Sequence, residues 1–226
     1  MEGWNMARPS KPLLDHQSVI DTSIELIEEI GMDKFSMPKV ARALGVQTSS
    51  LYHYFADRNA LMTEVARKIM REAPMPPMPQ DDDWVEWFVE LSFNYREAIR
   101  RYPNAAIVLV EFLPRDVLTG NYDWCAHILA ESNIDPALHV ALLDGLEKIS
   151  FATVLSSLRR ATSSASDTAV FPHADADRHP ALMRALAANS WSEDQLFEVT
   201  IRSFITGLLH AGTDAVVAGA ITVAAS

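Results

Sequence analysis

The sequence has only one cysteine, Cys125, among its 226 residues. A single cysteine cannot form an internal disulfide and cannot supply a cysteine-only metal site. The longest uncharged apolar run, residues 215–225, is too short and too rich in alanine and glycine to span a bilayer. The N-terminus lacks the basic-then-apolar pattern of a secretion signal. We therefore expect a soluble, cytoplasmic protein.

Motifs of catalysis and of phosphate binding are also missing. The sequence has neither a Gly-rich phosphate loop nor the G-x-S-x-G motif of a nucleophilic serine, and Cys125 is best interpreted as a buried structural residue. His173, Asp175, Asp177 and His179 alternate along a polar segment, where extended backbone could direct them to one metal. A solvated loop is the simpler interpretation. We expect no enzyme, no cofactor and no metal site.

The net charge of −11 argues at first against a nucleic-acid partner. The charge is unevenly distributed, however. Residues 1–73 hold nine Lys and Arg against ten Asp and Glu, whereas residues 74–226 hold ten against twenty. The near-neutral part places its cations in a short arm at residues 8–11 and again between residues 39 and 58. One small DNA-binding module is therefore compatible with the overall acidity, with weak non-specific binding.

Apolar residues recur with helical spacing throughout, and no convincing alternating strand is present. The sequence therefore predicts an all-α fold, a three-helix helix-turn-helix domain followed by a larger helical domain. The predicted helices of the first domain are residues 15–30, a segment beginning after Ser36, residues 49–55, and a segment capped by Asp57. The predicted helices of the second domain are residues 84–101, 104–113, 122–132, 135–161, 180–188, and a segment from Ser192 to about His210.

Four prolines between residues 74 and 79 mark the predicted domain boundary, because proline cannot continue a helix. We expect an N-terminal arm and DNA-binding domain over residues 1–73, with the helix-turn-helix at about 37–56. A stiff linker over residues 74–83 and a ligand-binding and dimerisation domain over residues 84–226 follow. Residues 162–178 are small and polar and predict a mobile loop, and the tail after Thr213 is either frayed helix or disordered.

Residues 36–61 have the pattern of two short helices joined by a tight turn. Gly45 permits the left-handed backbone of such a turn, and Val46 fills it. On a helical wheel Leu51 and Phe55 face the interior and Tyr54 lies partly inside, while hydroxyl and imidazole groups lie on the outside. This arrangement predicts a helix-turn-helix whose second helix enters the major groove. A plain helical hairpin with a polar outer face is the alternative.

The stretch "VARALGVQTSSLYHYFADRNALMTEV", residues 40–65, resembles the DNA-binding domain of the TetR family of bacterial transcriptional repressors. The resemblance implies a homodimer on a near-palindromic operator, released by a small molecule. It implies DNA contacts from the second helix and its flanks. One departure is Met37-Pro38, which offers few polar contacts where the first helix begins. The residues expected to contact bases or phosphates are Lys39, Gln47, Thr48, Ser49, Ser50, Tyr52, His53 and Arg58.

Aromatic residues concentrate in the predicted helices between residues 84 and 151. They predict either a helical core or a pocket for an apolar or aromatic ligand, with a few polar groups to orient it. Glu111 lies within an apolar run, where a charge is costly unless it is used; it could equally face solvent or pair with Arg115. The candidate ligand residues are Trp87, Phe88, Asn94, Tyr95, Glu111, Phe112, Trp124 and Phe151.

Two later helices have apolar and small residues on more than one side, which predicts a four-helix dimer interface made by this pair from each subunit. The alternative is an internal core. The residues concerned are Leu138, Leu142, Gly145, Ile149 and Ala152, with Ile201, Phe204, Ile205, Gly207 and Leu208. We expect a homodimeric transcriptional regulator. The competing hypotheses are a helical-bundle enzyme or ligand-binding protein using the aromatic pocket, and a helical adaptor that need not be a dimer.

Overall fold

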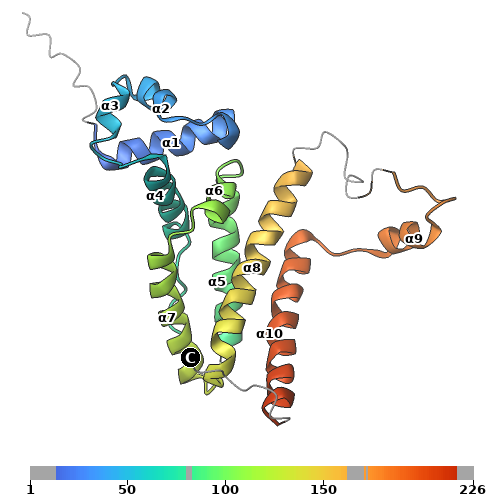
Figure 1. The fold of residues 1–226 in the computed structure, drawn as a ribbon. Coiled ribbons are helices and arrows are strands. Elements are labelled where there is room, and N and C mark those ends of the chain that lie inside the picture. The colour runs from blue at the N-terminus through green and yellow to red at the C-terminus, as the bar shows by residue number, and fades with distance from the viewer. Residues whose placement is uncertain (1–13, 80–82, 162–170, 172, 218–226) are drawn as a thin grey trace, which may run out of the picture. The chain divides into compact units, whose positions relative to one another are not determined.

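The computed structural model describes residues 14–79, 83–161, 171 and 173–217 (Figure 1). Within these residues the chain forms ten α-helices, one short 3-10 helix and no strand, which confirms the all-α fold. The chain divides into two compact units. The N-terminal unit comprises Met1–Lys68 and Asn104–Pro114, and the C-terminal unit comprises Ile69–Pro103 and Arg115–Ser226.

The N-terminal unit is a small helical domain with α6 added to it. Asp15 caps α1 reciprocally: its carboxylate accepts from the Ser18 N–H at 2.7 Å, and the Ser18 hydroxyl accepts from the Asp15 N–H at 3.1 Å. Its elements are α1 (His16–Ile30), a 3-10 turn (Met32–Lys34), α2 (Met37–Leu44), α3 (Thr48–Leu51), most of α4 (Arg58–Arg71), and α6 (Ala106–Glu111).

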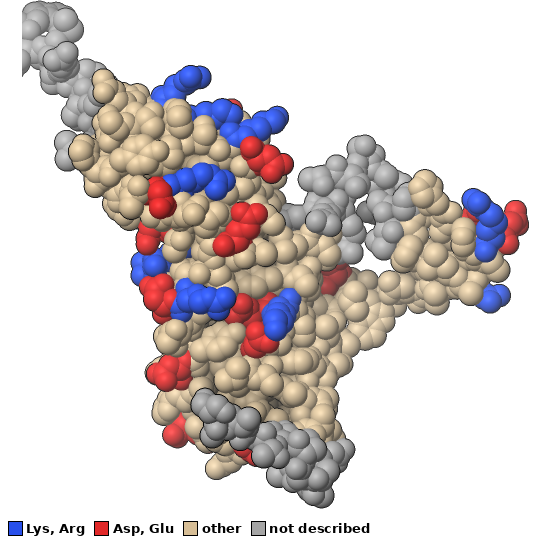
Figure 2. Space-filling view, in the orientation of Figure 1, with Lys and Arg blue, Asp and Glu red and all other residues tan. Residues whose placement is uncertain are grey.

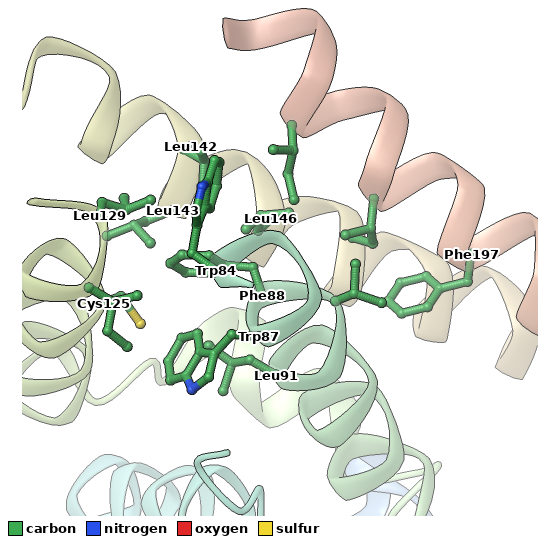
Figure 3. Packing of buried hydrophobic residues seen from close by; sticks show 14 residues of the cluster. Trp84, Trp87, Phe88, Leu91, Cys125, Leu129, Leu142, Leu143, Leu146 and Phe197 are labelled. Carbon is green, nitrogen blue, oxygen red and sulfur yellow. The ribbon is translucent and has the colours of Figure 1, made fainter. Parts of the chain in front are cut away.

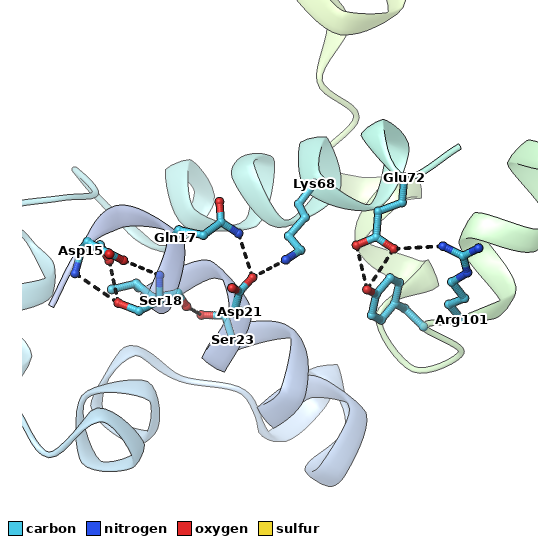
Figure 4. A network of polar contacts seen from close by, with 10 residues as sticks. Asp15, Gln17, Ser18, Asp21, Ser23, Lys68, Glu72 and Arg101 are labelled. Carbon is cyan, nitrogen blue, oxygen red and sulfur yellow. Dashed lines mark hydrogen bonds and ion pairs between the residues drawn. The ribbon is translucent and has the colours of Figure 1, made fainter. Parts of the chain in front are cut away.

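The apolar faces of α1, α2 and α4 form the core of this unit, because their buried residues recur every three or four positions. Polar contacts at the edges connect the helices. Lys68 of α4 forms an ion pair with Asp21 of α1 (Figure 4). The Glu28 carboxylate of α1 accepts the backbone N–H groups of Asn104 at 3.0 Å and Ala105 at 2.8 Å, directly before α6. These contacts explain why α6 belongs to the N-terminal unit.

The C-terminal unit is a helical bundle with a continuous apolar core. Trp84, Trp87 and Phe88 of α5 pack edge to face among leucines of α7 and α8 and the apolar side of α10 (Figure 3). None of the residues in α9 is buried. The elements of this unit are the last turn of α4, α5 (Trp84–Arg100), α7 (Arg115–Glu131), α8 (Pro136–Ala161), α9 (Pro180–Ala188) and α10 (Glu193–Val217).

Helices α8 and α10 approach closely within one chain. A Cβ atom added to Gly145 would overlap the ring of Phe204. Leu142, Ile201 and Ile205 are fully buried in the same core. Part of the two apolar rows therefore packs inside the chain, whereas Ala152 and Gly207 of the same rows are exposed. The dimer interface expected from this pair of helices stays a prediction.

The proline-rich segment after α4 packs onto α5 and belongs to the C-terminal unit. The Asn94 side-chain amide donates to the Pro74 carbonyl oxygen at 2.9 Å, and the Trp87 indole N–H donates to that of Pro77 at 2.8 Å. Glu72 accepts from the Tyr102 hydroxyl at 2.8 Å in the same region (Figure 4). The division between the two units thus falls within α4, whereas the sequence predicted it at residues 74–83. It also assigns α6 to the N-terminal unit, although α6 follows α5 in the chain.

Several boundaries differ from those expected, and some expectations lie outside the described residues. Helix α3 ends at Leu51 rather than at residue 55, and α7 begins at Arg115 rather than at residue 122. The basic arm at residues 8–11 and most of the expected loop at 162–178 lie outside the described part; α10 is described to Val217. Among the helices that are described, none is long and apolar enough to cross a membrane.

Candidate nucleic-acid interface and ligand cavity

Backbone hydrogen bonds close the turn between α2 and α3. Gly45 has φ 67° and ψ 31°, in the left-handed region that glycine adopts without strain. Its N–H donates to the Arg42 carbonyl oxygen at 3.1 Å, and the Val46 N–H donates to that of Ala41 at 2.9 Å. This pairing satisfies the last carbonyls of α2, so the direction in which α3 leaves the turn is set by the backbone.

Buried side chains hold α3 on the domain. Leu51 is fully buried, and Phe55 lies in the core with the ring of His16 4.3 Å from its own. The Tyr54 hydroxyl donates to the Leu14 carbonyl oxygen at 2.6 Å. This bond, which joins positions 40 residues apart, supports the packing role expected for Tyr54, although its side chain remains 38% exposed.

Four of the expected DNA-contacting residues on and beside α3 lie on the surface, and Tyr52 among them is 52% exposed despite its aromatic ring. Thr48 and Ser50 are half-buried. We call the four the α3 surface; they are Gln47, Ser49, Tyr52 and His53.

Cations lie on α2 and on the 3-10 turn before it. Lys34, Lys39 and Arg42 are exposed, and Figure 2 shows Lys and Arg side chains along the part of the N-terminal unit where Figure 1 places α2. The Lys39 ammonium donates to the Lys34 carbonyl oxygen at 2.7 Å. Lys39 must therefore leave this contact, or share its remaining protons, to reach a phosphate.

The structure does not place Arg58 with the α3 surface. Its guanidinium carbon lies 5.7 Å from the ring centre of Phe35 and 5.8 Å from that of Phe112, and Nη2 donates weakly to the Met32 sulfur at 3.8 Å. Arg58 is half-buried and connects α4 with the α1–α2 connection and with the residue after α6. Packing between two rings accounts for this placement.

The C-terminal unit contains a cavity of about 560 Å³, part of it open to solvent. Its walls come from α5, α7 and α8, with Met70 at the end of α4. Along α5 the lining residues are Phe88, Leu91, Ser92, Tyr95 and Ile99. Those of α7 are Leu118, Asn121, Tyr122 and Cys125, and those of α8 are Leu143, Leu146, Glu147, Ser150 and Phe151.

Two hydrogen-bonded pairs supply most of the polarity of this cavity. The Asn121 amide donates to the Tyr95 hydroxyl at 2.6 Å, and the Tyr122 hydroxyl donates to the Glu147 carboxylate at 2.7 Å. The two serine hydroxyls donate to backbone carbonyls of their own helices. The remaining lining is apolar or aromatic, which is typical of sites for small apolar molecules.

Burial shifts the titration of the cavity groups. It raises the pKa of the Glu147 carboxyl above its usual value, an effect that the Tyr122 hydrogen bond opposes without cancelling. Burial also raises the pKa of Tyr95 to about 12 and that of the Cys125 thiol to about 12. The pKa of Tyr122 is raised as well, first by burial and then by its bond to the carboxylate. The thiol and both phenols are therefore neutral near pH 7.

Three of the eight candidate ligand residues, Phe88, Tyr95 and Phe151, line the cavity. The other five lie elsewhere for identifiable reasons. The side chains of Trp87 and Asn94 bond to the proline-rich segment, and Trp124 is 43% exposed on α7. Glu111 is exposed at the end of α6, and Phe112 lies against Arg58, both in the N-terminal unit.

Asn121, Tyr122 and Glu147 are cavity residues that aromatic clustering alone does not indicate. Spacing could have found them. Asn121 and Tyr122 lie three and four residues after Leu118, and Glu147 lies four after Leu143, so all three fall in rows that point to the core. A polar residue inside such a row is the signal.

Among the described residues, no group of three or more His, Cys, Asp or Glu side chains is placed to hold a metal ion. In the segment around His179, the Asp175 carboxylate accepts from Arg178 at 2.6 Å, and the His179 Nδ1 atom accepts from the Asp175 N–H at 3.3 Å. These local bonds occupy Asp175 and His179, two of the four groups that alternate along the sequence.

The comparisons with known proteins agree with this geometry. The family model described as bacterial regulatory proteins, tetR family, matches residues 19–65, from α1 into α4. The tetracycline repressor protein class G of Vibrio anguillarum is 27% identical over 143 residues, which cover 63% of this chain and 68% of that protein. The class A repressor from transposon 1721 of Escherichia coli is 31% identical over 94 residues, which cover 41% of this chain and 44% of that protein.

A solved structure shares the fold over most of the chain. The TetR family protein ActR of Streptomyces coelicolor, in complex with actinorhodin, has a TM-score of 0.72 at 21% identity, covering 88% of this chain and 98% of that one. The helix-turn-helix geometry and the matched residues lead to one conclusion. Residues 19–65 match the DNA-binding domain of the tetR family of bacterial regulatory proteins, and the chain as a whole has the fold of a regulator of that family.

Proposed function

We propose that this regulator is a cytoplasmic repressor that binds a near-palindromic operator as a homodimer and leaves it when a small apolar or aromatic molecule occupies the cavity. The observation that carries the proposal is the α3 surface. Gln47, Ser49, Tyr52 and His53 are exposed on an element whose apolar side is anchored in the core. Short polar side chains so presented can reach base edges and phosphates in the major groove.

Symmetry of the operator requires two copies of the α3 surface, about one helical turn of DNA apart. Exposed apolar residues support pairing of two chains in the C-terminal unit. Leu196 and Val199 lie one turn apart on α10, and Val140 lies on α8. We propose that these surfaces, rather than the buried rows of the same helices, meet in the dimer. Leu196→Glu together with Val199→Glu is expected to shift the chain to monomer in sedimentation velocity, whereas Met78→Glu, at another exposed apolar site, leaves the dimer intact.

Ligand release requires that the cavity influence the DNA-binding helices. The polypeptide itself connects a cavity helix to the N-terminal unit. Helix α7 lines the cavity, and it continues backward through residues 112–114 into α6, which Glu28 holds to α1. A ligand that binds better to one position of α7 shifts the equilibrium of α6, and operator affinity changes by the same factor as ligand affinity. The complex of ActR with actinorhodin supports a ligand role for the corresponding domain.

We propose no catalytic role for the cavity. Its thiol remains protonated near neutral pH, because burial raises the pKa of Cys125 to about 12. The hydroxyls of Ser92 and Ser150 donate to backbone carbonyls and have no base beside them in the described contacts.

The test begins with selection of a duplex from a random library by the full-length chain, followed by fluorescence anisotropy on the selected sequence. We expect a near-palindrome. Ser49→Ala with Tyr52→Phe removes two hydrogen-bonding groups from each chain of the dimer, four in all, so affinity is expected to fall by roughly 1000-fold, at about 1 kcal/mol per bond. Ser156→Ala, an exposed serine of α8, is the matched control and leaves affinity unchanged. Full affinity in the double variant, or failure to select any duplex, contradicts the proposal.

A further inference from the structure

The cavity contains one carboxylate among otherwise apolar and neutral groups. Glu147 lines it from α8, and no Lys, Arg or His is among its lining residues. Among the described residues the carboxylate accepts one hydrogen bond, from the Tyr122 hydroxyl at 2.7 Å. Two carboxylate oxygens offer about four acceptor positions, so most of the acceptor capacity of Glu147 is left for another partner.

The other polar groups of the cavity offer a ligand more hydrogen-bond acceptors than donors. The Asn121 amide donates to Tyr95, which leaves the Asn121 carbonyl oxygen as an acceptor. The Tyr122 hydroxyl proton is engaged by Glu147. The Tyr95 hydroxyl retains its own proton and is the remaining phenolic donor. A ligand in the cavity can therefore donate hydrogen bonds to two or more acceptor atoms.

Aromatic rings complete this environment. Phe88, Tyr95, Tyr122 and Phe151 come from three different helices and line the same cavity. The face of an aromatic ring attracts a cation, and the attraction is larger where water is excluded. Rings and carboxylate together favour a positive charge carried on an apolar body.

The charges around Glu147 do not neutralise it within the cavity. Lys148 forms an ion pair with Asp144, both on α8, and Arg115 lies near enough on α7 to lower the pKa of Glu147. Burial outweighs these influences and raises that pKa. A buried carboxylate that lacks a cationic partner is costly, and a cationic guest would remove this cost.

We propose, building on the ligand role proposed above, that the cavity binds an apolar or aromatic molecule that carries one protonated amine, that Glu147 pairs with this amine, and that the cavity rejects the equivalent carboxylate. Rejection follows from the same geometry. An anionic guest would place two like charges in a site of low polarity with no lining cation between them.

Three anthracene derivatives that differ only in one substituent test this specificity: 9-(aminomethyl)anthracene, 9-anthracenemethanol and 9-anthracenecarboxylate. Fluorescence titration of the full-length chain without DNA gives each affinity at pH 7.5. We expect the amine to bind at least about 10-fold more tightly than the alcohol, since a charge-assisted bond is about twice as strong as a neutral one. We expect the carboxylate to bind more weakly than the alcohol.

Glu147→Gln keeps the shape and removes the charge, so the preference for the amine over the alcohol is expected to disappear while the alcohol affinity stays within about threefold. Glu90→Gln, the same change at an exposed position of α5, is the control and retains the preference. Circular dichroism establishes that each variant is folded.

Equal binding of the three compounds, tighter binding of the carboxylate, or no binding of the amine up to about 1 mM overturns this inference. Persistence of the amine preference in Glu147→Gln overturns it as well. Each of these outcomes leaves the operator titration unaffected, because the ligand titration contains no DNA. Loss of operator binding, in turn, would contradict the proposed repressor function and leave the ligand preference measurable.

Discussion

Replacing Glu28 by alanine tests how firmly α6 is attached to α1. The carboxylate accepts two backbone N–H groups directly before α6, and the Asn104 side-chain amide donates to the Glu28 carbonyl oxygen at 2.8 Å. The alanine variant retains only the last of these bonds. The N–H groups of Asn104 and Ala105 then lose their acceptor at a position where no helical carbonyl replaces it.

The expected magnitude follows from the charge and the burial of the site. Hydrogen bonds to a charged acceptor contribute about 1.5–3 kcal/mol each. Part of this is offset, because Glu28 is half-buried and burial raises the pKa of its carboxyl. We expect a net loss of about 2 kcal/mol for Glu28→Ala, and about half of that for Glu28→Gln, which keeps one acceptor oxygen.

Hydrogen exchange of the α6 amides, followed by mass spectrometry, measures this loss directly. A loss of about 2 kcal/mol corresponds to roughly 30-fold faster exchange through local opening. Glu25→Ala, an exposed glutamate on the same helix, is the control and leaves the exchange rate unchanged. Unaltered exchange in Glu28→Ala would refute the reasoning, because α6 would then be held by its apolar contacts alone.

Three further predictions follow from single positions. Gly45→Ala places a Cβ in the left-handed region and is expected to lower the free energy of unfolding by about 1–2 kcal/mol in urea titration, and an unchanged midpoint would contradict this. Gly145→Ala forces the Phe204 ring to move and is expected to cost about 1–3 kcal/mol; Gly120→Ala, in an open helical position of α7, is the control and is expected to be neutral or stabilising. Because the pKa of Glu147 is raised by folding, its carboxyl binds protons more readily in the folded state, so its contribution to stability is present below the ordinary glutamate pKa and is lost as pH rises through the raised value. Thermal unfolding of Glu147→Gln should lack this dependence on pH, and a curve that matches the wild type would contradict the prediction.

The sequence predicted the elements whose signals are local. Gly45, the apolar rows of α1 and α4, and the buried Leu51 and Phe55 all follow from residues close together in the chain. The end of α3 was placed too late, since periodicity continues through residues 52–54 although the backbone there forms turns.

Tertiary contacts determine the features that the sequence did not predict. The proline-rich segment, expected as a stiff linker, is attached to α5, because carbonyls at Pro74 and Pro77 accept side-chain donors from that helix. Arg58 lies between two rings because Phe112, 54 residues later, packs beside it. Aromatic content predicted either a core or a pocket in the C-terminal part, because composition alone does not distinguish a ring that lines a cavity, such as Tyr95, from one that fills a core, such as Trp87.

The turn at Gly45 has an evolutionary consequence. Backbone bonds and buried residues fix the geometry of the turn, so the four side chains of the α3 surface contribute little to folding. Substitutions at these positions are therefore expected to be nearly free of a stability penalty. Under the proposed function, a duplicated copy of this gene could acquire a new operator through changes at Gln47, Ser49, Tyr52 and His53 while its cavity, and hence the signal to which it responds, stays the same.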